Sequence, residues 1–592
     1  ETQNFTSATD TFNTAVGYNA GTAVTTGTNN TLIGGLAGDA TTTGGDNVAV
    51  GYTAFGANTT GASNVALGAF ALDANTTASN NTAVGTSSLG ANTTGAGNTG
   101  IGRVALLANT TGADNVALGY RALNANTTAN NNTAVGKDAL YVNTTGSSNT
   151  ALGTNALLDN TTGGENTVCG AFSLRNNTTG ESNFAGGFQA LQANTTGSNN
   201  VGIGRLALYA NTTGVNNISV GKDSLKANTT ASNNTAVGKS ALNANTTGHG
   251  NIGIGNSALA ANTTGISNVA VGYLAADAQA GNANYNVAIG AEALSTNTLG
   301  SQNVAIGRSA LIAFNVTSAA ATYNTAVGDQ AGAAVTTGTK NTFVGAQAGD
   351  ANTTASDNSA FGYASLGANT TGTGNNAFGI QSLDANTTGN YNTAFGHVAM
   401  TTNITGTDNT GFGSQVLYSV TGSSNTALGS AAGYAISSGS NNLVLGRDAG
   451  RTGSPGGNFT TVSNVMCLGD ENMSACNIQT DWTVASDQRD KTDFTALDLG
   501  LDFVKALAPV TYKWDKRSKY GNKKADDYDL LDQTPDGTHK EDWLDIGFKA
   551  QEVEALEIAA GYNKSNKTNL TTSLTGDGKQ YGIQYSKFVP IL

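Results

Sequence analysis

Few residues of the chain have the types and spacing that chemistry requires. The segment NNTAVGKS (233–240) approaches the phosphate-binding pattern G-x-x-x-x-G-K-[ST]. However, Asn233 stands where the first glycine is needed, and the same frame recurs elsewhere without the lysine. His249, His397 and His539 are scattered along the chain, so they predict no metal site. We therefore expect no nucleotide, metal or other cofactor.

The segment SDQRDK (486–491) holds a serine and a lysine, two residue types that occur in nucleophilic catalysis. From the residues alone, a structural interpretation is sufficient. Ser486 would cap the following turn with Asp487 as its companion, and Lys491 would remain in solvent.

The tripeptide NTT recurs through most of the chain and matches the acceptor pattern for N-glycosylation. An asparagine at a fixed corner of stacked coils would instead form a hydrogen-bonded ladder, which explains the pattern without sugar. Rows of threonine could also bind ice, but an extended ANTT segment points its two threonines to opposite faces. We favour the structural role for both residue types.

Composition limits the possible classes of protein. The chain has 592 residues with 78 Gly, 11% charged residues and 7% aromatic residues, which indicates stacked backbone with thin cores rather than disorder or an ordinary globular core. The formal charge of −13, without a basic stripe, predicts no nucleic-acid partner. No apolar run approaches the ~20 residues that span a bilayer, so we expect no membrane insertion. Three cysteines exclude a disulfide-rich scaffold; Cys467 and Cys476 could pair or remain free thiols.

Most of the chain consists of copies of one internal repeat. Glycine follows an AVG-like step at Gly17 and then at every seventeenth residue to Gly272, which gives sixteen consecutive copies. With later copies at spacings of 16 to 23 residues there are 27 in total. The consensus is N-[TV]-A-[VIL]-G-x-x-A-L-x-A-N-T-T-G-x-x.

One repeat predicts one turn of a β-solenoid or β-roll. The [TV]-A-[VIL] step alternates like a two-faced strand, A-L-x-A-N-T-T predicts a second short extended piece, and G-x-x-N makes the corner. Stacking at a strand spacing of ~4.8 Å predicts a rod on the order of 125 Å long. Isolated coils cannot offset their backbone entropy, so stacking is obligatory. The small Ala/Gly face suggests close contact between chains, and we predict a parallel homotrimer.

The N-[TV]-A-[VI]-G step resembles the repeated motif of trimeric-autotransporter head domains over about residues 11–470. That resemblance implies a trimer of left-handed parallel β-rolls.

The distribution of residue types divides the chain. All three Trp and all four Pro lie beyond residue 450, and 15 of 27 Lys and Arg lie in residues 481–592. Residues 11–40 recur in close variation as residues 322–351. We predict a mainly β protein organised as a lead-in (1–10), a first rod segment (11–311), a joint or bulged loop (312–323), a second rod segment (324–470), a linker (471–485) and a small α+β C-terminal domain (486–592).

In the C-terminal domain, LDLGLDFVKAL (497–507) predicts an amphipathic helix that ends before Pro509. VTYKW (510–514) predicts a strand, and AQEVEAL (550–556) predicts a second helix.

Four blocks of this domain carry a second resemblance: SDQRDK (486–491), LGLDFVKALAPVTYKW (499–514), IGFKAQEVEAL (546–556) and YGIQYSKFVPIL (581–592). In this order they resemble the self-cleaving intramolecular chaperone of phage tail fibres and tailspikes, including endosialidase tailspikes. The resemblance implies that the domain trimerises the chain and then cuts itself off by a Ser–Lys mechanism. It makes Ser486 the nucleophile and Lys491 the base, in a single-turnover reaction without an external substrate. It also implies a trimeric helix after Leu592.

A lysine acts as a base only when desolvation or a neighbouring charge lowers its pKa. A trimer interface would supply that burial.

Our leading hypothesis is a trimeric virion tail fibre, extracellular, that displays a surface for a host glycan or protein receptor. The alternative is a bacterial adhesin or extracellular filament subunit at the cell surface. An enzyme acting on polysaccharide would need paired carboxylates, but acidic residues are sparse in the repeats. Receptor contacts should lie at the variable x positions, where solvated decoration is the competing explanation; the candidates are Tyr52, Phe70, Arg103, Tyr120, Arg121 and Tyr141.

Overall fold

The computed structural model describes residues 11–474, 476, 477, 479, 486–497, 499–522, 527–566, 568, 570–575 and 578–591. The predicted lead-in (1–10) and much of the predicted linker (471–485) lie outside these residues. The chain divides into two compact units, Glu1–Asn324 and Thr325–Leu592. Each unit is described by itself.

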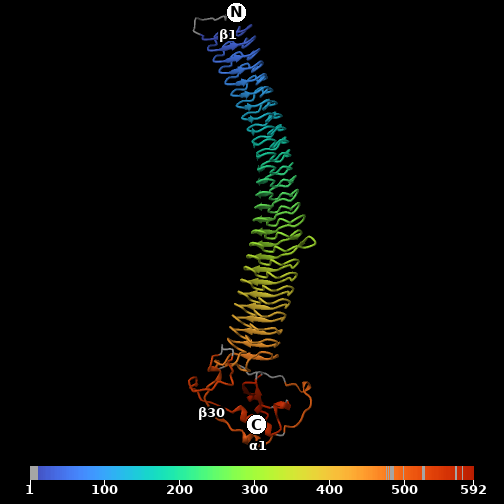
Figure 1. Cartoon of the computed structure of the whole chain (residues 1–592), viewed down its shortest axis with the longest axis vertical. Coiled ribbons are helices and arrows are strands. Elements are labelled where there is room, and N and C mark those ends of the chain that lie inside the picture. Colours follow the sequence, from blue (N-terminus) through green and yellow to red (C-terminus); the bar gives the residue numbers. More distant parts are fainter. Residues whose placement is uncertain are drawn as a thin grey trace. The chain divides into compact units, whose positions relative to one another are not determined.

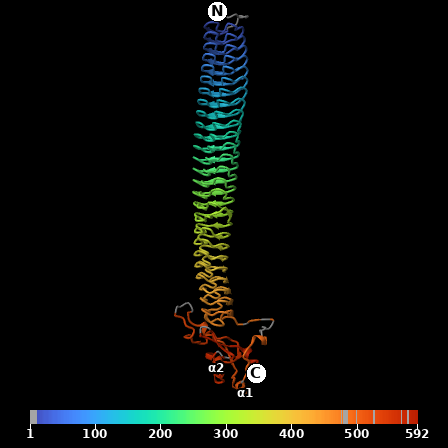
Figure 2. The same ribbon diagram turned by 90° about the vertical axis from the view of Figure 1, so that its right-hand side faces the viewer.

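The first unit is a stack of coils, each of which contributes one three-residue strand (Figures 1 and 2). Each strand pairs in parallel with the equivalent residues of the next coil. The strands are β1 (Thr14–Val16), β2 (Thr31–Ile33), β3 (Val48–Val50), β4 (Val65–Leu67), β5 (Thr82–Val84), β6 (Thr99–Ile101), β7 (Val116–Leu118), β8 (Thr133–Val135), β9 (Thr150–Leu152), β10 (Thr167–Cys169), β11 (Phe184–Gly186), β12 (Val201–Ile203), β13 (Ile218–Val220), β14 (Thr235–Val237), β15 (Ile252–Ile254), β16 (Val269–Val271), β17 (Val287–Ile289) and β19 (Val304–Ile306).

The segment 312–323 belongs to a lengthened last coil of the first unit. Phe314 is fully buried there. Strand β20 (Ala320–Ala321) pairs in parallel with β18 (Gly300–Ser301), and Figure 1 shows the intervening loop projecting from the coils in yellow-green.

The second unit begins with nine further coils of the same kind, again paired in parallel. The repeat strands of the two units equal the 27 copies that the sequence predicts. The strands of the second unit are β21 (Thr325–Val327), β22 (Thr342–Val344), β23 (Ser359–Phe361), β24 (Asn376–Phe378), β25 (Thr393–Phe395), β26 (Thr410–Phe412), β27 (Thr426–Leu428), β28 (Leu443–Leu445) and β29 (Met466–Leu468).

After the coils the second unit changes to short mixed elements, as the sequence predicts. Strands β30 and β31 form one antiparallel pair, and β32 and β33 form another. The elements are the 3-10 helices η1 (Gln488–Asp490), η2 (Arg517–Lys519), η3 (Lys564–Asn566) and η4 (Tyr585–Phe588), the helices α1 (Leu501–Ala506) and α2 (Ala550–Ala559), and the strands β30 (Val510–Tyr512), β31 (Asp545–Gly547), β32 (Thr572–Leu574) and β33 (Tyr581–Ile583).

The strands alternate between two faces, but the small face is not a contact between chains. In β8, Ala134 is fully buried within its own coil, whereas Thr133 and Val135 on either side are partly exposed. The same pattern holds in β3 and β4. The predicted Ala/Gly contact face is therefore wrong, because these residues line the thin core of the single chain.

The predicted second extended piece does not form a strand, since A-L-x-A is a series of turns and the N-T-T that follows it is a bend. Asp138 and Leu140 both adopt the left-handed region, at φ 57° and 51°. As a result, the Asp138 amide bonds to Tyr120 O of the preceding coil, and the Leu140 amide bonds to Ala156 O of the following coil. Leu140 thereby enters the core, where it is fully buried.

Core volume is balanced within single coils. Gly38 and Gly349 replace the usual buried leucine, and a Cβ on either would collide with Leu32 or Phe343 of the strand in the same coil. These larger residues replace the usual strand alanine. The recurrence of residues 11–40 at 322–351 is thus a second, compensated way to fill a coil.

Two asparagine ladders follow the stack. Asn132 Nδ2 donates to Gly146 O at 2.9 Å, and its Oδ1 accepts the Asn149 amide at 2.9 Å. The asparagine of the NTT tripeptide forms the second ladder: Asn143 Nδ2 donates to Asn126 Oδ1 at 3.1 Å, and Asn160 Nδ2 donates to Asn143 Oδ1 at 2.8 Å. All these asparagines are fully buried. The structure therefore supports the ladder, and a folded coil offers these asparagines to no glycosylating enzyme.

The two adjacent threonines of each NTT tripeptide differ in their exposure. Thr144 is partly buried and its hydroxyl donates to Thr161 O at 3.0 Å, whereas Thr145 is exposed. Only one of the two adjacent threonines thus forms an outward row. Within the described residues no helix has the length and apolar character that would allow it to cross a membrane.

Candidate functional site

Ser486 and Lys491 lie at the two ends of the short helix η1 and their side chains meet. Lys491 Nζ donates a hydrogen bond to Ser486 Oγ at 2.5 Å. The single turn of η1 provides this geometry, because it folds the chain back over five residues. The amide of Lys491 closes the turn on Gln488 O. A serine hydroxyl in contact with a lysine amine is the pairing that a Ser–Lys nucleophile requires.

The turn is capped by Asp487 rather than by Ser486. Asp487 Oδ1 accepts the Arg489 amide at 2.9 Å, and its carboxylate also binds the Arg489 guanidinium. These hydrogen bonds from Arg489 hold the pKa of Asp487 below its usual value. The structural interpretation of Ser486 as the cap is therefore wrong, and its hydroxyl is left to contact Lys491.

Ser486 and Lys491 are both exposed in the single chain. A lysine serves as a base when burial or a neighbouring cation favours its neutral form. The nearby cation, Arg489, is already paired with Asp487. The single chain thus supplies the contact between the two groups but not the burial.

The C-terminal domain that follows Ser486 and Lys491 contains a buried carboxylate that sequence reasoning missed. Glu557 of α2 accepts hydrogen bonds from the amide and hydroxyl of Thr571 and from Thr572. Burial tends to raise the pKa of Glu557, but the hydrogen bonds from Thr571 and Thr572 outweigh it and the pKa is lowered. The contact fixes α2 to β32. An acidic residue in the apolar pattern of AQEVEALE was the available signal.

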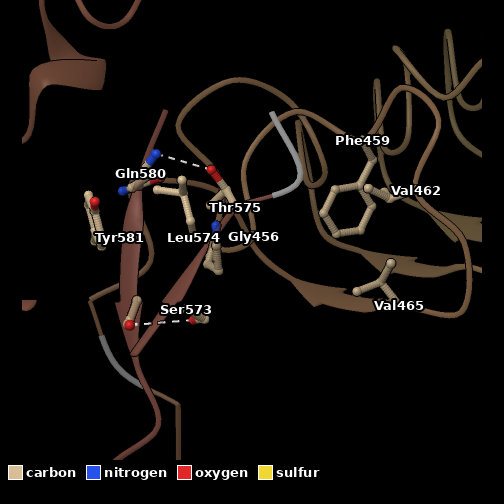
Figure 3. A pocket seen from close by; sticks show the side chains of 11 residues that line it. Gly456, Phe459, Val462, Val465, Ser573, Leu574, Thr575, Gln580 and Tyr581 are labelled. Atoms are coloured by element: carbon tan, nitrogen blue, oxygen red, sulfur yellow. Dashed lines mark hydrogen bonds between the residues drawn. The ribbon is translucent and has the colours of Figure 1, made fainter. Parts of the chain in front are cut away.

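Hairpin β32–β33 and the last coils of the second unit line an open pocket of about 360 Å³ (Figure 3). Phe459, Val462 and Val465 line it from the coils, and Leu574 and Tyr581 line it from the hairpin. None of its lining residues is charged. The pocket therefore offers apolar contact together with uncharged polar groups, and Tyr581 is its one titratable side chain.

The candidate receptor residues form two groups. Tyr52 and Phe70 make an edge-to-face pair with ring centroids 5.6 Å apart. The others gather around Arg121, whose guanidinium lies over the rings of Tyr120 and Tyr141 at 5.0 and 4.8 Å.

Arg121 also forms a two-point ion pair with Asp138 of the next coil, at 2.7 and 2.9 Å. Arg103 lies over the Tyr120 ring at 5.9 Å. The candidates therefore contact neighbouring side chains, while Tyr52, Phe70 and Tyr120 remain 55%, 42% and 40% exposed.

Sequence reasoning missed a column of cations at the position after the repeat glycine. Arg205, Lys222 and Lys239 occupy that position in three successive coils, and all are exposed. Backbone hydrogen bonds join these coils, from Asp223 N to Arg205 O at 3.0 Å and from Ser240 N to Lys222 O at 2.9 Å. Asp223 pairs with Lys222 but, among the described residues, no acidic side chain pairs with Arg205 or Lys239. The column concentrates positive charge on an acidic chain.

Potential metal ligands do not cluster. Within the described part of the chain, no group of three or more His, Cys, Asp or Glu side chains could hold a metal ion. Cys169, Cys467 and Cys476 are free thiols, so the possible Cys467–Cys476 pair is not formed.

Comparison with known protein families finds a match for one part of the chain. Residues 486–562 match the family described as chaperone of endosialidase. The match begins at Ser486 and covers three of the four blocks that carry the resemblance in the sequence. No curated protein matches the chain.

Proposed function

We propose that this chain, which carries a chaperone-of-endosialidase domain behind a parallel β-solenoid, is a trimeric fibre protein that its own C-terminal domain assembles. The observation that carries the proposal is the match of residues 486–562, which begins just after the last coil strand, β29. A chaperone domain attached to a repetitive rod suits the hardest step of such a fold. Identical coils can pair in many registers, so three chains need a device that aligns them before the coils stack.

We further propose that the domain releases itself at Ser486. In the assembled trimer, Lys491 in its neutral form takes the proton of Ser486 Oγ as the oxygen attacks the carbonyl carbon of the preceding peptide bond. The C–N bond breaks, the proton passes to the freed amino group of Ser486, and water hydrolyses the ester. The 2.5 Å contact between Nζ and Oγ supports this assignment, and the exposure of both groups in one chain supports a reaction that waits for assembly.

Intact mass and oligomeric state test the proposal together. The full chain is expressed as wild type and as Ser486→Ala, Lys491→Ala and the control Lys505→Ala, which changes an exposed lysine of α1. We expect wild type and the control to yield a fragment of residues 486–592, and the two site variants to remain uncut. Wild-type protein that is monomeric and uncut overturns both proposals. An uncut trimer overturns only the cleavage.

We place the fibre on a virion tail, outside the cell. A bacterial surface adhesin or filament subunit is the second candidate, because the N-[TV]-A-[VI]-G step resembles adhesin heads. Immunogold labelling with an antibody against residues 11–324 distinguishes them. Label on tail fibres of purified particles supports the first, and label on the surface of cells without particles supports the second.

The variable positions of the coils would bind the host receptor. We propose the cation column Arg205, Lys222 and Lys239 as a contact for an acidic cell-surface glycan, because stacked cations at ~4.8 Å spacing attract repeating negative charge. Neutralising the column with glutamines should weaken binding to a sulfated or uronate polysaccharide about tenfold. Arg205→Gln alone should already weaken binding measurably, whereas Arg121→Gln, at a cation that is paired with Asp138, should change it little. Equal effects would remove the column as the contact.

A further inference from the structure

We propose that the outer face of the repeat sheet is the surface through which copies of this chain pack side by side. The outer face consists of the first and third residues of each three-residue repeat strand, and its occupant is the same face of another copy. The inference deepens the proposed trimer by naming its contact surface, and it replaces the buried Ala/Gly face that the sequence suggested.

The third strand residue points outward yet is apolar in every coil. It is Val, Ile, Leu, Phe, Cys or Gly in all 27 repeat strands, and neither the first nor the third residue is charged in any of them. Many of these side chains are well exposed in the single chain, for example Leu118 at 44%, Ile203 at 40% and Leu428 at 55%. Scattered exposed apolar residues are ordinary, but a continuous patch of this kind marks an interaction surface.

Charge is abundant next to this face but absent from it. Two residues beyond the third strand position lie the exposed cations Arg205, Lys222 and Lys239. If solvent alone covered the outer face, charged residues should occur there as they do two residues further along the chain. Its restriction to Thr, Ser, Asn and apolar residues within one chain instead indicates that it is covered.

Where a strand has glycine at its third position, a neighbouring side chain fills the space on the outer face. In β11 the third residue is Gly186, and a Cβ there would lie 3.3 Å from Cε1 of Phe184, the first residue of the same strand. The Phe184 ring therefore covers the place that the missing side chain would leave.

In the second unit four successive third positions are phenylalanines, Phe361, Phe378, Phe395 and Phe412. Their rings stack with centroids 4.6, 5.0 and 5.7 Å apart. Phe395 and Phe412 remain 48% and 41% exposed. Burial of such rings is among the strongest apolar contributions to an interface.

The length and period of the face identify its partner. A strip about 10 Å wide over the 18 repeat strands of the first unit, at a strand spacing of ~4.8 Å, has an area on the order of 850 Å². That is close to the ~800 Å² which one protein contributes to a standard stable interface, and in a trimer the strip is shared between two neighbouring copies. A surface that repeats its side chains at every strand spacing is matched along its length by another surface with the same repeat, which a copy of this chain in parallel provides.

Cys169 provides a native probe, because it is a free, exposed thiol at the third position of β10. The assembled full chain is treated with a small thiol reagent, and the rate at each cysteine is read by peptide mass spectrometry. The control is Thr145→Cys, at an exposed turn position outside the face. In the trimer we expect Cys169 to react at least tenfold more slowly than the thiol introduced by Thr145→Cys, and we expect the two rates to converge in denaturant.

A second measurement disrupts the face with charge. Leu118→Glu with Leu152→Glu places carboxylates on the outer face, and Thr128→Glu with Thr162→Glu places them at exposed turn positions of nearby coils. By sedimentation, we expect the first pair to yield monomer with the β-type circular dichroism retained, and the second to remain trimeric.

The outcomes separate the two proposals. A trimeric wild type with a freely reactive Cys169 leaves the proposed function in place and overturns the interface. Trimer retained by the Leu118→Glu, Leu152→Glu variant also overturns it. A monomeric wild type overturns both.

Discussion

The coils and the C-terminal domain bury their side chains to very different degrees. In a coil, the alanine of the strand, the leucine after it and both asparagines are fully buried, and hydrogen bonds to neighbouring coils satisfy the backbone. Residues 486–591, in contrast, leave Trp543, Ile546 and Val589 74–80% exposed. The coils complete a core within one chain and leave medium-sized apolar residues partly exposed along the outer face of the repeat sheet, whereas the C-terminal domain leaves large apolar side chains almost fully exposed. The difference suits a domain that registers chains and a rod that stacks once they are registered.

The largest effect should come from a methyl group at a repeat glycine. Gly136 has φ +135°, and a Cβ there would lie 2.6 Å from Gly153 O of the next coil. We expect Gly136→Ala to destabilise the coils by on the order of 4 kcal/mol, because backbone must move to relieve the collision. The urea midpoint of the β-type circular dichroism measures it.

The matched change in the C-terminal domain is Gly500→Ala. Gly500 has φ −91° and no atom within 4 Å of an added Cβ. Because Gly500 is the N-cap of α1, where alanine is less favourable than glycine, we expect a loss of stability of no more than about 1 kcal/mol. Similar losses from both alanines would show that the coils are not packed as tightly as described.

Removing one rung of an asparagine ladder should have the next largest effect. Asn143→Ala deletes the bonds to Asn126 Oδ1 and Gly146 O and leaves Asn160 Nδ2 without its side-chain acceptor. We expect a loss of about 3 kcal/mol from these buried groups. Asn256→Ala, which removes only an exposed contact with Ser257, should be nearly neutral. An equally mild Asn143→Ala would deny the ladder its structural role.

Acid should act in opposite directions on the two regions. Burial raises the pKa of Asp384 in the coils, so its folded form binds a proton more readily, and the coils gain stability as pH falls through that raised pKa. Glu557 has a lowered pKa, so its contribution is present above the ordinary glutamate pKa and is lost as pH falls through the folded value.

A titration from pH 7 to pH 3 should therefore change the tryptophan fluorescence of the C-terminal domain while the β-type dichroism of the coils persists. Glu557→Gln should remove much of the acid sensitivity of the fluorescence. Loss of the coil signal first would contradict this order.

The smallest effect should be a gain in stability. Among the residues that the structure describes, Thr41 Oγ1 is buried without a hydrogen-bond partner. Val24 and Val335 are buried at the equivalent position of other coils. We expect Thr41→Val to raise the stability of the first unit by about 1 kcal/mol. Thr59→Val, which deletes the bond to Thr76 O at 3.1 Å, should lower it by a similar amount. Calorimetry compares the two.

The repeat made the coils predictable because each copy carries the same residue types at the same spacing. The period, the number of strands and the asparagine ladder follow from the fixed spacing of Asn, Ala and Gly. The side of the strand that faces inward does not, since alternation groups Thr133 with Val135 but leaves open whether Ala134 or its neighbours form the core. The left-handed conformation of Leu140 was not predictable either, because leucine has no intrinsic preference for it. Packing into the thin core imposes it.

In the C-terminal domain, the two helices and the strand β30 followed from local patterns. The contact of Ser486 with Lys491 depends on the turn of η1, which Asp487 caps. Their catalytic role remains a prediction, because its requirement for burial concerns the assembly rather than the single chain.

The most direct test of the account asks whether residues 486–592 are needed to make the rod but not to keep it. The chain 1–485 is expressed alone and compared, by sedimentation, with the rod recovered after wild-type chain has cut itself. We predict that the chain expressed alone fails to trimerise, whereas the recovered rod of the same sequence is a stable trimer. Trimers of equal yield and stability from both routes would contradict the assembly role of the C-terminal domain.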